Sequence, residues 1–495
     1  MSHRSASAPS HPDPTTTPQT DHTRTHGGTV NKQHPVSRRN ILKAGGTAAL
    51  AVGAGSLLTS PAFAEDGEAG LYDAIVIGAG FAGATAARDL KDKGLRPLVL
   101  EARDRVGGRV YSADYDGVAI ERGGAWLHPN YHRTYAEMKR YGLTTVVDTP
   151  VEQVIYPRNG TYAPVDPVAT SQRVGELLGR VFEGSQDYFP RPNEPLYRAD
   201  LLKSVDPLSL ADRLRALNLS SEDRSLIHGQ LATYSGGDAV NGGLTALAQW
   251  WALCDWNADG WNKMTAARIS TGATSLVQAM LSGIPVRLSS PVVSVTDNGS
   301  KVRVVTRSGL AYSAPVAVVA VPVNIWRTIQ FNPGLPTVFA NATTEGVGVR
   351  PHAAKMWLRV AGVTTRLAAQ GEAGDPIASL VTHGFFSNGD ALMIALNGPG
   401  LNVNDRAAVE TALKRIVPTA RIISTKVQDW VNETYTQGGW GMRRPGQMLR
   451  QLPAIHQPHG RITFASGDMP NGWIGSFEGA IETGNRAANQ AAALI

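Results

Sequence analysis

The chain has 495 residues, 42% of them hydrophobic, which is enough for two or three domains around a large core. Its formal net charge is +6, but residues 1–64 hold six basic and two acidic residues, so the remainder carries only +2 and no Lys/Arg-rich run that would indicate a nucleic-acid partner. Cys254 is the single cysteine, which excludes an intrachain disulfide and a cysteine-based metal site.

The N-terminal segment has the features of an export leader. Residues 1–36 are rich in Thr, Ser, Pro and His and lack apolar periodicity, so we expect them to be disordered. The twin arginine Arg38-Arg39 precedes a mild apolar run over 44–58, and Ala62-Phe-Ala64 is an A-x-A cleavage signal. This order predicts a twin-arginine signal peptide, a mature start near Glu65 and a periplasmic or secreted protein. The apolar run is too short and too rich in Ala and Gly to predict a stable membrane span, and an uncleaved anchor is the alternative.

A glycine-rich turn follows the first expected strand of the mature chain. Residues 74–77 form a short apolar run, the signature of a buried parallel strand, and Gly78, Gly80 and Gly83 follow at G-x-G-x-x-G spacing. The first glycine allows a tight turn, the second lets a pyrophosphate approach the backbone, and the third lets the next helix pack on the strand. That helix is expected over 81–91, with its N-terminal amides directed at the phosphates.

A second strand and an acidic residue complete the pattern of a dinucleotide-binding unit. Residues 96–100 predict the strand, and Glu101 stands at its end, 18 residues after Gly83. A dinucleotide fold needs an acid at this distance for the ribose hydroxyls. The alternative is a purely structural βαβ turn, but strand, glycines, helix, strand and acid occur here in the expected order.

The next two segments indicate which nucleotide binds. Residues 101–109 read E-A-R-D-R-V-G-G-R and residues 121–126 read E-R-G-G-A-W, and both stretches resemble the flavin-dependent amine oxidase family. Guanidinium groups beside a glycine turn suit a pyrophosphate. The resemblance implies FAD as the cofactor and, besides the residues named above, implies contacts to it from Ala82, Arg103, Gly108, Arg109, Gly124, Ala125, Trp126 and Val292.

The resemblance also implies the fold. We expect an α/β protein of amine oxidase type, with a two-domain FAD-binding fold of the glutathione-reductase-like Rossmann class and a substrate domain of mixed sheet plus helices. The pattern predicts helices at 130–142 and across most of 170–262, and it predicts short strands between 284 and 321. The expected domains are 70–128, 262–330 and 456–495 for a discontinuous FAD-binding domain, and 129–261 and 331–455 for the substrate-binding domain.

The tryptophan-rich stretch over 249–256 has two interpretations. Its rings could line a substrate cavity, or they could pack a helix against the core. Packing is the interpretation that the pattern favours for most of them.

The C-terminal segment carries a second FAD signal. Residues 461–468 predict a strand that ends at Asp468, and residues 471–480 are expected to open a final helix that runs to about Leu494. This segment resembles the C-terminal motif of the amine oxidase family. The resemblance implies that Asp468 binds the ribityl or pyrophosphate part of FAD, and that the isoalloxazine ring is bordered by Gly472, Trp473 and Ile474.

Three residues are expected to act on the substrate. Lys355 lies in an apolar strand, where a lysine ordinarily reaches for the surface, but the resemblance implies that it holds a water at flavin N5. Trp440 stands where mammalian monoamine oxidases have the cysteine that tethers FAD, so we expect non-covalent FAD. The combination of residues 123–128, Trp440 and 471–473 most resembles bacterial nicotine oxidases, which implies that Trp440 and Asn471 contact the amine. No tryptophan occurs near Ser379, which leaves nicotine itself open as the substrate.

Together these features predict an exported, FAD-dependent amine oxidase. Its substrate would be a secondary or cyclic, aromatic-bearing amine, such as a nicotine-like alkaloid, oxidised to an imine or iminium by hydride transfer to flavin N5. The alternatives are an L-amino acid oxidase that uses Arg443 and Arg444 as a carboxylate clamp, and a non-catalytic FAD-binding electron-transfer subunit. We expect oxygen or a redox protein as electron acceptor, no metal site and no nucleic-acid partner. A homodimer is one assembly that the sequence allows.

Overall fold

A parallel five-stranded sheet carries the glycine-rich motif. The computed structural model describes residues 71–158 and 160–495, so the expected leader lies outside the described residues. All four pairings in the sheet are parallel. The strand order is β10 (Val286–Arg287), β2 (Pro97–Leu100), β1 (Ala74–Ile77), β14 (Val316–Val319) and β21 (Ile462–Phe464). Since β1, β2 and β14 are buried along their whole length, their apolar runs form the centre of the core.

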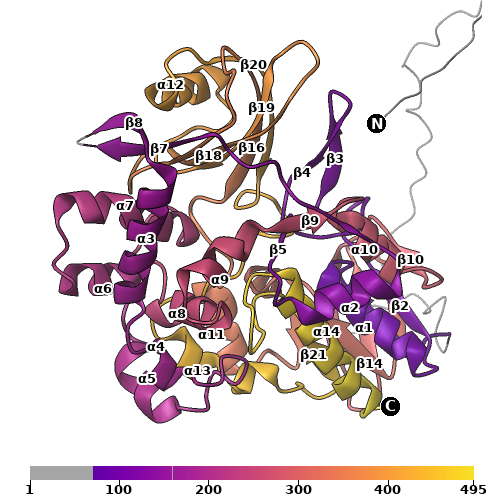
Figure 1. Cartoon of the computed structure of the whole chain (residues 1–495). Helices are drawn as coiled ribbons and strands as arrows, with labels where there is room; N and C mark the ends of the chain where they lie inside the picture. Colours follow the sequence, from indigo (N-terminus) through magenta and orange to yellow (C-terminus); the bar gives the residue numbers. More distant parts are fainter. Residues whose placement is uncertain (1–70, 159) are drawn as a thin grey trace, which may run out of the picture. The chain divides into compact units, whose positions relative to one another are not determined.

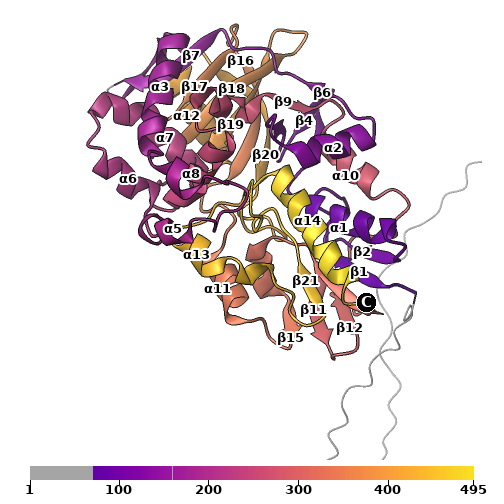
Figure 2. The same cartoon turned by 60° about the horizontal axis from the view of Figure 1, so that its bottom comes forward.

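Two helices from opposite ends of the chain pack side by side on this sheet. The helix α1 (Phe81–Asp92) follows β1, and α14 (Phe477–Ala492) follows β21 (Figures 1 and 2). A Cβ atom on Gly484 would lie only 2.5 Å from the carbonyl oxygen of Ala82. Glycine at this position therefore allows the two helix backbones to come into contact.

The C-terminal elements are shorter than the sequence suggested. The strand expected over 461–468 ends at Phe464, and the final helix begins at Phe477 rather than near Asn471. The Ser476 hydroxyl accepts a hydrogen bond from the backbone N–H of Gly479 and so caps the helix. The chain from 465 to 476 is therefore a loop between sheet and helix.

A seven-stranded mixed sheet lies at the top of Figure 1, whereas β2, β14 and β21 of the parallel sheet lie in its lower half. Only the pairing of β17 with β7 is parallel, and the other five are antiparallel. The helix α12 (Arg406–Ile416) buries Leu413 and Ile416 in the apolar cluster on this sheet. The strand order is β20 (Arg421–Asp429), β16 (Ala354–Ala361), β19 (Ala391–Asn397), β18 (Ile377–Phe385), β17 (Leu367–Gln370), β7 (Gln153–Arg158) and β8 (Thr161–Val165).

The described residues also form three smaller sheets. One contains β13 (Ala311–Ala314), β12 (Val302–Thr306), β11 (Val292–Asp297) and β15 (Gln330–Asn332). A hairpin contains β3 (Ser112–Tyr115) and β4 (Val118–Glu121), and a three-stranded sheet contains β5 (Trp126–Leu127), β9 (Ala267–Ile269) and β6 (Thr145–Val146).

Helices fill the region predicted to be helical between 170 and 262. Several begin at the polar residues that favour helix starts, and Ser209 and Asp212 form a capping box at α6. In the described ranges, no helix has both the length and the apolarity needed to cross a bilayer. The helices are α2 (His132–Arg140), α3 (Pro167–Val181), α4 (Ser185–Tyr188), α5 (Ala199–Val205), α6 (Leu210–Ala216), α7 (Ser221–Tyr234), α8 (Leu244–Leu253) and α9 (Ala258–Asn262), followed later by α10 (Ala273–Met280), α11 (Thr337–Glu345) and α13 (Gln447–Gln451).

The parallel sheet draws its strands from three distant stretches of the chain. They lie in 74–100, 286–319 and 462–464, and each falls within one of the three segments expected to form the FAD-binding domain. The exact domain boundaries stay a prediction.

Candidate active site

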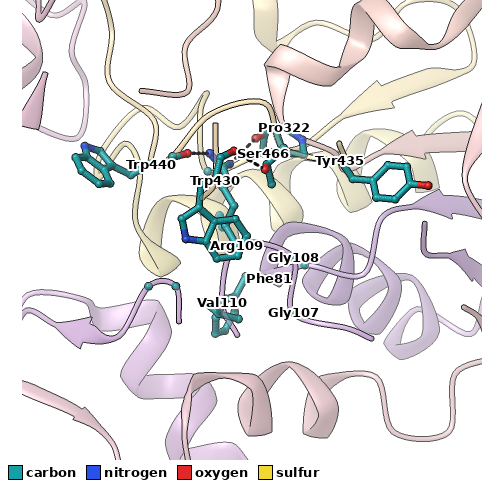
Figure 3. A pocket seen from close by; sticks show the side chains of 18 of the residues that line it. Phe81, Gly107, Gly108, Arg109, Val110, Pro322, Trp430, Tyr435, Trp440 and Ser466 are labelled. Carbon is teal, nitrogen blue, oxygen red and sulfur yellow. Dashed lines mark hydrogen bonds between the residues drawn. The ribbon is translucent and has the colours of Figure 1, made fainter. Parts of the chain in front are cut away.

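A cavity of about 570 Å³ extends from the glycine-rich motif to the mixed sheet. Figure 3 shows Arg109 and Trp430 in its middle, with Tyr435 on one side and Trp440 on the other. A volume of this size falls in the range of small-molecule sites. Its wall includes most of the expected cofactor residues: Gly78, Gly80, Ala82, Glu101, Arg103, Gly108, Arg109, Gly124, Ala125, Trp126 and Val292.

The glycines at the start of α1 have the roles that the motif suggested. Gly78 has φ +105°, and a Cβ there would lie 2.7 Å from the carbonyl oxygen of Ala320. Gly83 lies outside the cavity lining, and a Cβ there would lie 1.9 Å from the carbonyl oxygen of Gly78, so it serves the packing of helix on strand. α1 begins at Gly80 without a side-chain cap and has no acid in its first turn. Its N-terminal amides therefore remain available to an anion.

A buried acid and a guanidinium group border the same end of the cavity. Glu101 accepts hydrogen bonds from the backbone N–H groups of Ala79 (2.8 Å) and Arg103 (2.9 Å), and it is only 3% exposed. The Arg103 side chain pairs with Glu433 and lies 5.4 Å from the ring centroid of Tyr435. These contacts hold a carboxylate and a cation beside the glycine turns. Together with α1, they fit the ribose and phosphates of a dinucleotide such as the implied FAD.

Arg109 is held in the middle of the cavity by Asp468. The Nη1 atom of Arg109 lies 2.6 Å from Oδ1 of Asp468, and it also donates to the carbonyl oxygen of Gly439 at 2.8 Å. The other carboxylate oxygen of Asp468 accepts from the backbone N–H of Val323 and from the Ser466 hydroxyl. Asp468 itself does not line the cavity, whereas Ser466 does. In this structure the acid acts as a partner of Arg109, and its direct contact to FAD stays a prediction.

The Gly123-Gly124 pair passes between two aromatic rings. A Cβ on Gly123 would lie 2.9 Å from Cζ2 of Trp430, and a Cβ on Gly124 would lie 2.8 Å from Cε1 of Phe477. Phe477 in turn stacks on Phe81 at the start of α1, with ring centroids 4.9 Å apart. Only glycines allow this segment to reach the cavity between the rings without displacing them.

Lys355 lines the cavity from the start of β16. It is 5% exposed, its Nζ donates to the carbonyl oxygen of Gly123 at 3.0 Å, and Nζ lies 4.6 Å from the ring centroid of Trp126. Burial lowers the pKa of Lys355 to about 8, and the charge of Glu121 offsets part of that effect. Burial also raises the pKa of Glu121. Lys355 is thus a buried cation whose proton is exchangeable near neutral pH.

Aromatic side chains form the far end of the cavity. Trp440 lines it and donates its indole N–H to the carbonyl oxygen of Tyr234 at 3.2 Å. Tyr234 meets Trp250 edge to face, with ring centroids 5.6 Å apart. Tyr131 completes the wall. Of these four, the family resemblance implies a substrate role for Trp440 alone, and the sequence pattern predicts mainly packing for the stretch that contains Trp250.

The substrate and cofactor residues expected at 471–474 lie outside the cavity lining. The backbone N–H groups of Asn471 and Gly472 donate to the Glu482 carboxylate, and Trp473 packs against His128 and Tyr131, with both centroid distances 4.9 Å. These contacts hold the segment behind the wall. The next three residues, Gly475, Ser476 and Phe477, line the cavity in their place. The structure therefore gives no support to a substrate contact from Asn471, or to flavin contacts from Gly472, Trp473 and Ile474.

Comparison with known proteins agrees with this arrangement. A family model described as flavin containing amine oxidoreductase matches residues 81–492. The chain is 32% identical over 432 residues to a nicotine dehydrogenase of Pseudomonas putida, covering 86% of this chain and 89% of that protein. It is 30% identical over 444 residues to the (S)-6-hydroxynicotine oxidase of Paenarthrobacter nicotinovorans, covering 85% and 99%.

Solved structures show the same fold. A putrescine oxidase superposes with a TM-score of 0.73 at 21% identity, over 85% of this chain and 99% of that one. Cyclohexylamine oxidase from Brevibacterium oxydans gives a TM-score of 0.68 at 22% identity, again over 85% and 99%. These likenesses confirm the expected amine oxidase fold, and the family model implies FAD as the cofactor. The chain is an enzyme that belongs to the family of flavin-containing amine oxidoreductases.

Proposed function

We propose that this enzyme oxidises a secondary or cyclic amine that bears an aromatic ring. The observation that carries the proposal is the composition of the cavity wall. Its far end presents the rings of Tyr131, Tyr234, Trp250 and Trp440, and the one carboxylate in the lining, Glu101, lies at the nucleotide end. Rings suit an apolar, aromatic substrate, and they provide no counter-ion for a second ammonium group of a diamine.

The wall also favours the neutral form of the amine. An ammonium ion beside these rings would lack a carboxylate partner, and an unpaired buried charge is strongly disfavoured. A neutral amine retains the nitrogen lone pair, which forms the C=N bond as a hydride leaves the adjacent carbon. When bound, FAD supplies the redox step by accepting that hydride at N5. Trp440 and Tyr234 orient the amine, and the Lys355 ammonium supplies a proton donor and a positive charge at the same site.

An amino acid oxidase would need a cation for the substrate carboxylate. Arg443 is 1% exposed and donates to Gln249 Oε1 at 3.2 Å and to the carbonyl oxygen of Pro470 at 2.6 Å. Neither Arg443 nor Arg444 belongs to the cavity lining. Neither arginine can therefore clamp a substrate carboxylate, and Lys355, a cation that does line the cavity, already donates to the carbonyl oxygen of Gly123.

Anaerobic mixing of the holoenzyme with matched amines and α-amino acids tests the proposal. Amines without a carboxylate should bleach the flavin absorbance faster than the corresponding amino acids by about two orders of magnitude, because an unpaired buried carboxylate costs several kcal/mol. Trp440→Ala should slow bleaching by the amine more than Arg444→Ala does. Faster bleaching by the amino acids, abolished in the arginine variant, would replace this proposal with the amino acid oxidase.

The cellular setting belongs to the same proposal. We propose export by the twin-arginine route, with folding and FAD binding complete before transport, on the strength of Arg38-Arg39 and Ala62-Phe-Ala64, which lie outside the described residues. The electron acceptor is oxygen or a redox protein. The names of the relatives include both dehydrogenases and oxidases, so they leave both acceptors open. A homodimer stays a prediction.

A further inference from the structure

The ammonium group of Lys355 lies over two indole rings. Its Nζ is 4.6 Å from the ring centroid of Trp126 and 5.7 Å from that of Trp357. Both distances fall within the roughly 6 Å over which a cation is attracted to an aromatic face. Trp126 lines the cavity, whereas Trp357 is 1% exposed and lies outside the lining. The second ring is thus a core side chain within reach of the one lysine in the cavity wall.

Few other groups in the protein stabilise this charge. In the described part of the chain, one of the three N–H donors of the ammonium group meets the carbonyl oxygen of Gly123, at 3.0 Å, and no carboxylate forms an ion pair with the group. Four titratable groups act on it electrostatically: Glu121 on β4, Asp148 after β6, Arg268 on β9 and His383 on β18. The two acids favour the ammonium form, Arg268 opposes it, and burial lowers the pKa of His383 to about 4, which keeps this histidine neutral at pH 7. Burial nevertheless lowers the pKa of Lys355 to about 8, so these charges do not compensate for it.

Trp357 is held in place beside the lysine by its own contacts. Lys355 and Trp357 are two residues apart on β16, so their side chains share one face of the strand. The indole N–H of Trp357 donates to the carbonyl oxygen of Glu121 at 2.9 Å, two residues before the carbonyl that accepts from Lys355. The Trp357 ring also meets the His383 ring edge to face, with centroids 5.0 Å apart. The position of the indole relative to the ammonium group is therefore fixed by the protein.

We propose that Trp357 is a positioning residue that keeps Lys355 in its ammonium form at the cavity wall. The face of its indole ring attracts the buried charge, and its N–H bond to the backbone holds that face in place. Trp126 attracts the same charge but also borders the cavity, so Trp357 is the residue whose effect passes through Lys355 alone. The kinetic consequence of this inference rests on the proposed amine oxidation, in which the ammonium group supplies a proton donor and a positive charge.

Fluorinated tryptophans incorporated at position 357 test the inference with little change of shape. Ring fluorines withdraw electron density from the face that meets the cation, while the indole N–H and its hydrogen bond remain. Competitive labelling of the holoenzyme with trace acetic anhydride, followed by mass spectrometry of the peptide that contains Lys355, gives the pKa of this amine without any substrate. The pKa should fall with each added fluorine, by roughly one pH unit over the series, because the aromatic face then stabilises the ammonium form less.

Two ordinary variants separate the ring from its hydrogen bond. Trp357→Phe keeps an aromatic face and loses the N–H, whereas Trp357→Met loses both, so the pKa of Lys355 should fall by roughly one pH unit in the methionine variant and by less in the phenylalanine variant. Fluorinated tryptophan at position 251 is the matched control. Trp251 packs against Phe182 and Trp261 outside the cavity lining, so fluorine there should leave the pKa of Lys355 as in the wild type.

The rate of the flavin half-reaction gives a second readout. Its decrease with rising pH should move to lower pH by the same amount as the labelling pKa, a displacement that a loss of core packing alone would not produce. A labelling pKa that stays unchanged along the fluorine series would overturn the role of Trp357 and leave amine oxidation standing. A pKa that falls as expected in an enzyme whose flavin no amine reduces would support the hold of the ring on the ammonium group and overturn the proposed function.

Discussion

Replacement of Lys355 by methionine should slow flavin turnover while making the protein more stable. The side chain is 5% exposed, and burial lowers its pKa to about 8 from the ordinary 10.5. At neutral pH the native state therefore holds a charged lysine that burial disfavours by about 3 kcal/mol, at about 1.4 kcal/mol for each pH unit between the two pKa values. Methionine removes this penalty but also loses the hydrogen bond to Gly123, which is worth about 1 kcal/mol.

The sign of the pH dependence follows from the lowered pKa. Between pH 8 and 10.5 the unfolded chain binds more protons at this lysine than the native chain does, so the stability of the wild type should rise with pH in this window. The methionine variant should lack that rise, and its unfolding temperature at pH 7 should exceed that of the wild type. A general loss of structure would move the unfolding temperature in the opposite direction.

The lowered pKa of Lys355 should also make the rate of the flavin reaction depend on pH. The ammonium form of Lys355 carries the positive charge beside the flavin site, so the limiting rate of the half-reaction that it assists should fall as the pH rises through about 8. Stopped-flow measurement of flavin reduction and of reoxidation, each across pH 6.5 to 9.5, resolves that step. In the methionine variant the rate should drop by about 100-fold at pH 7, and the apparent pKa near 8 should disappear.

A lysine on the neighbouring strand is the matched control for this experiment. Lys426 lies on β20, outside the cavity lining, and Lys426→Met should keep the wild-type rates and pH profile. Wild-type rates in both half-reactions of Lys355→Met would refute the role of this lysine. An unchanged pKa near 8 in that variant would assign the titration to another group.

Three further outcomes are expected. The free energy of unfolding should fall as the pH drops below 6.5, because burial lowers the pKa of His383 to about 4 and that of His456 to about 3. Below pH 6.5 the unfolded chain binds more protons at these histidines than the native chain does, so each histidine lowers the stability by about 1.4 kcal/mol per pH unit. An unfolding temperature that is unchanged at pH 5 would contradict the burial argument. FAD should dissociate on acid or heat treatment, since Trp440 stands at the tethering position; a yellow polypeptide after precipitation would show a covalent link. Replacement of Arg38-Arg39 by two lysines should stop export, and mature protein outside the cytoplasm of cells that express this variant would remove the twin-arginine assignment.

The nucleotide end of the cavity could be predicted because its geometry is local. Gly78, Gly80 and Gly83 lie within one strand–turn–helix unit, and the close contact that requires glycine at position 83 is with the carbonyl oxygen of Gly78 inside that unit. Glu101 is fixed by the adjacent parallel strand and by the backbone N–H of Ala79. The spacing of these residues along the chain therefore predicts where they lie at the nucleotide end of the cavity.

In the C-terminal loop, residues 465–476, sequence spacing does not predict which residues line the cavity. Residues 471–474 and 475–477 are neighbours in sequence, but only the second group reaches the cavity. The difference comes from Glu482, one turn into α14, whose carboxylate binds the backbone of Asn471 and Gly472, and from the packing of Trp473 on His128. Those contacts are made between elements whose relative position the sequence pattern does not encode.

The aromatic wall was the least predictable part for a related physical reason. Tyr234 and Trp250 occupy helix positions that face the interior, and an apolar helix face has the same periodicity whether it meets a packed core or a cavity. Gln230, one turn before Tyr234 on α7, is a polar side chain beside this wall, and a buried carboxamide ordinarily has a hydrogen-bond partner. Among the described residues, Oε1 of Gln230 is buried and has no hydrogen-bond partner. An inward-facing polar residue does not by itself distinguish a binding wall from a packed core, because Gln249 on α8 is fully buried outside the cavity lining and bonds to Arg443 and the carbonyl oxygen of Pro192.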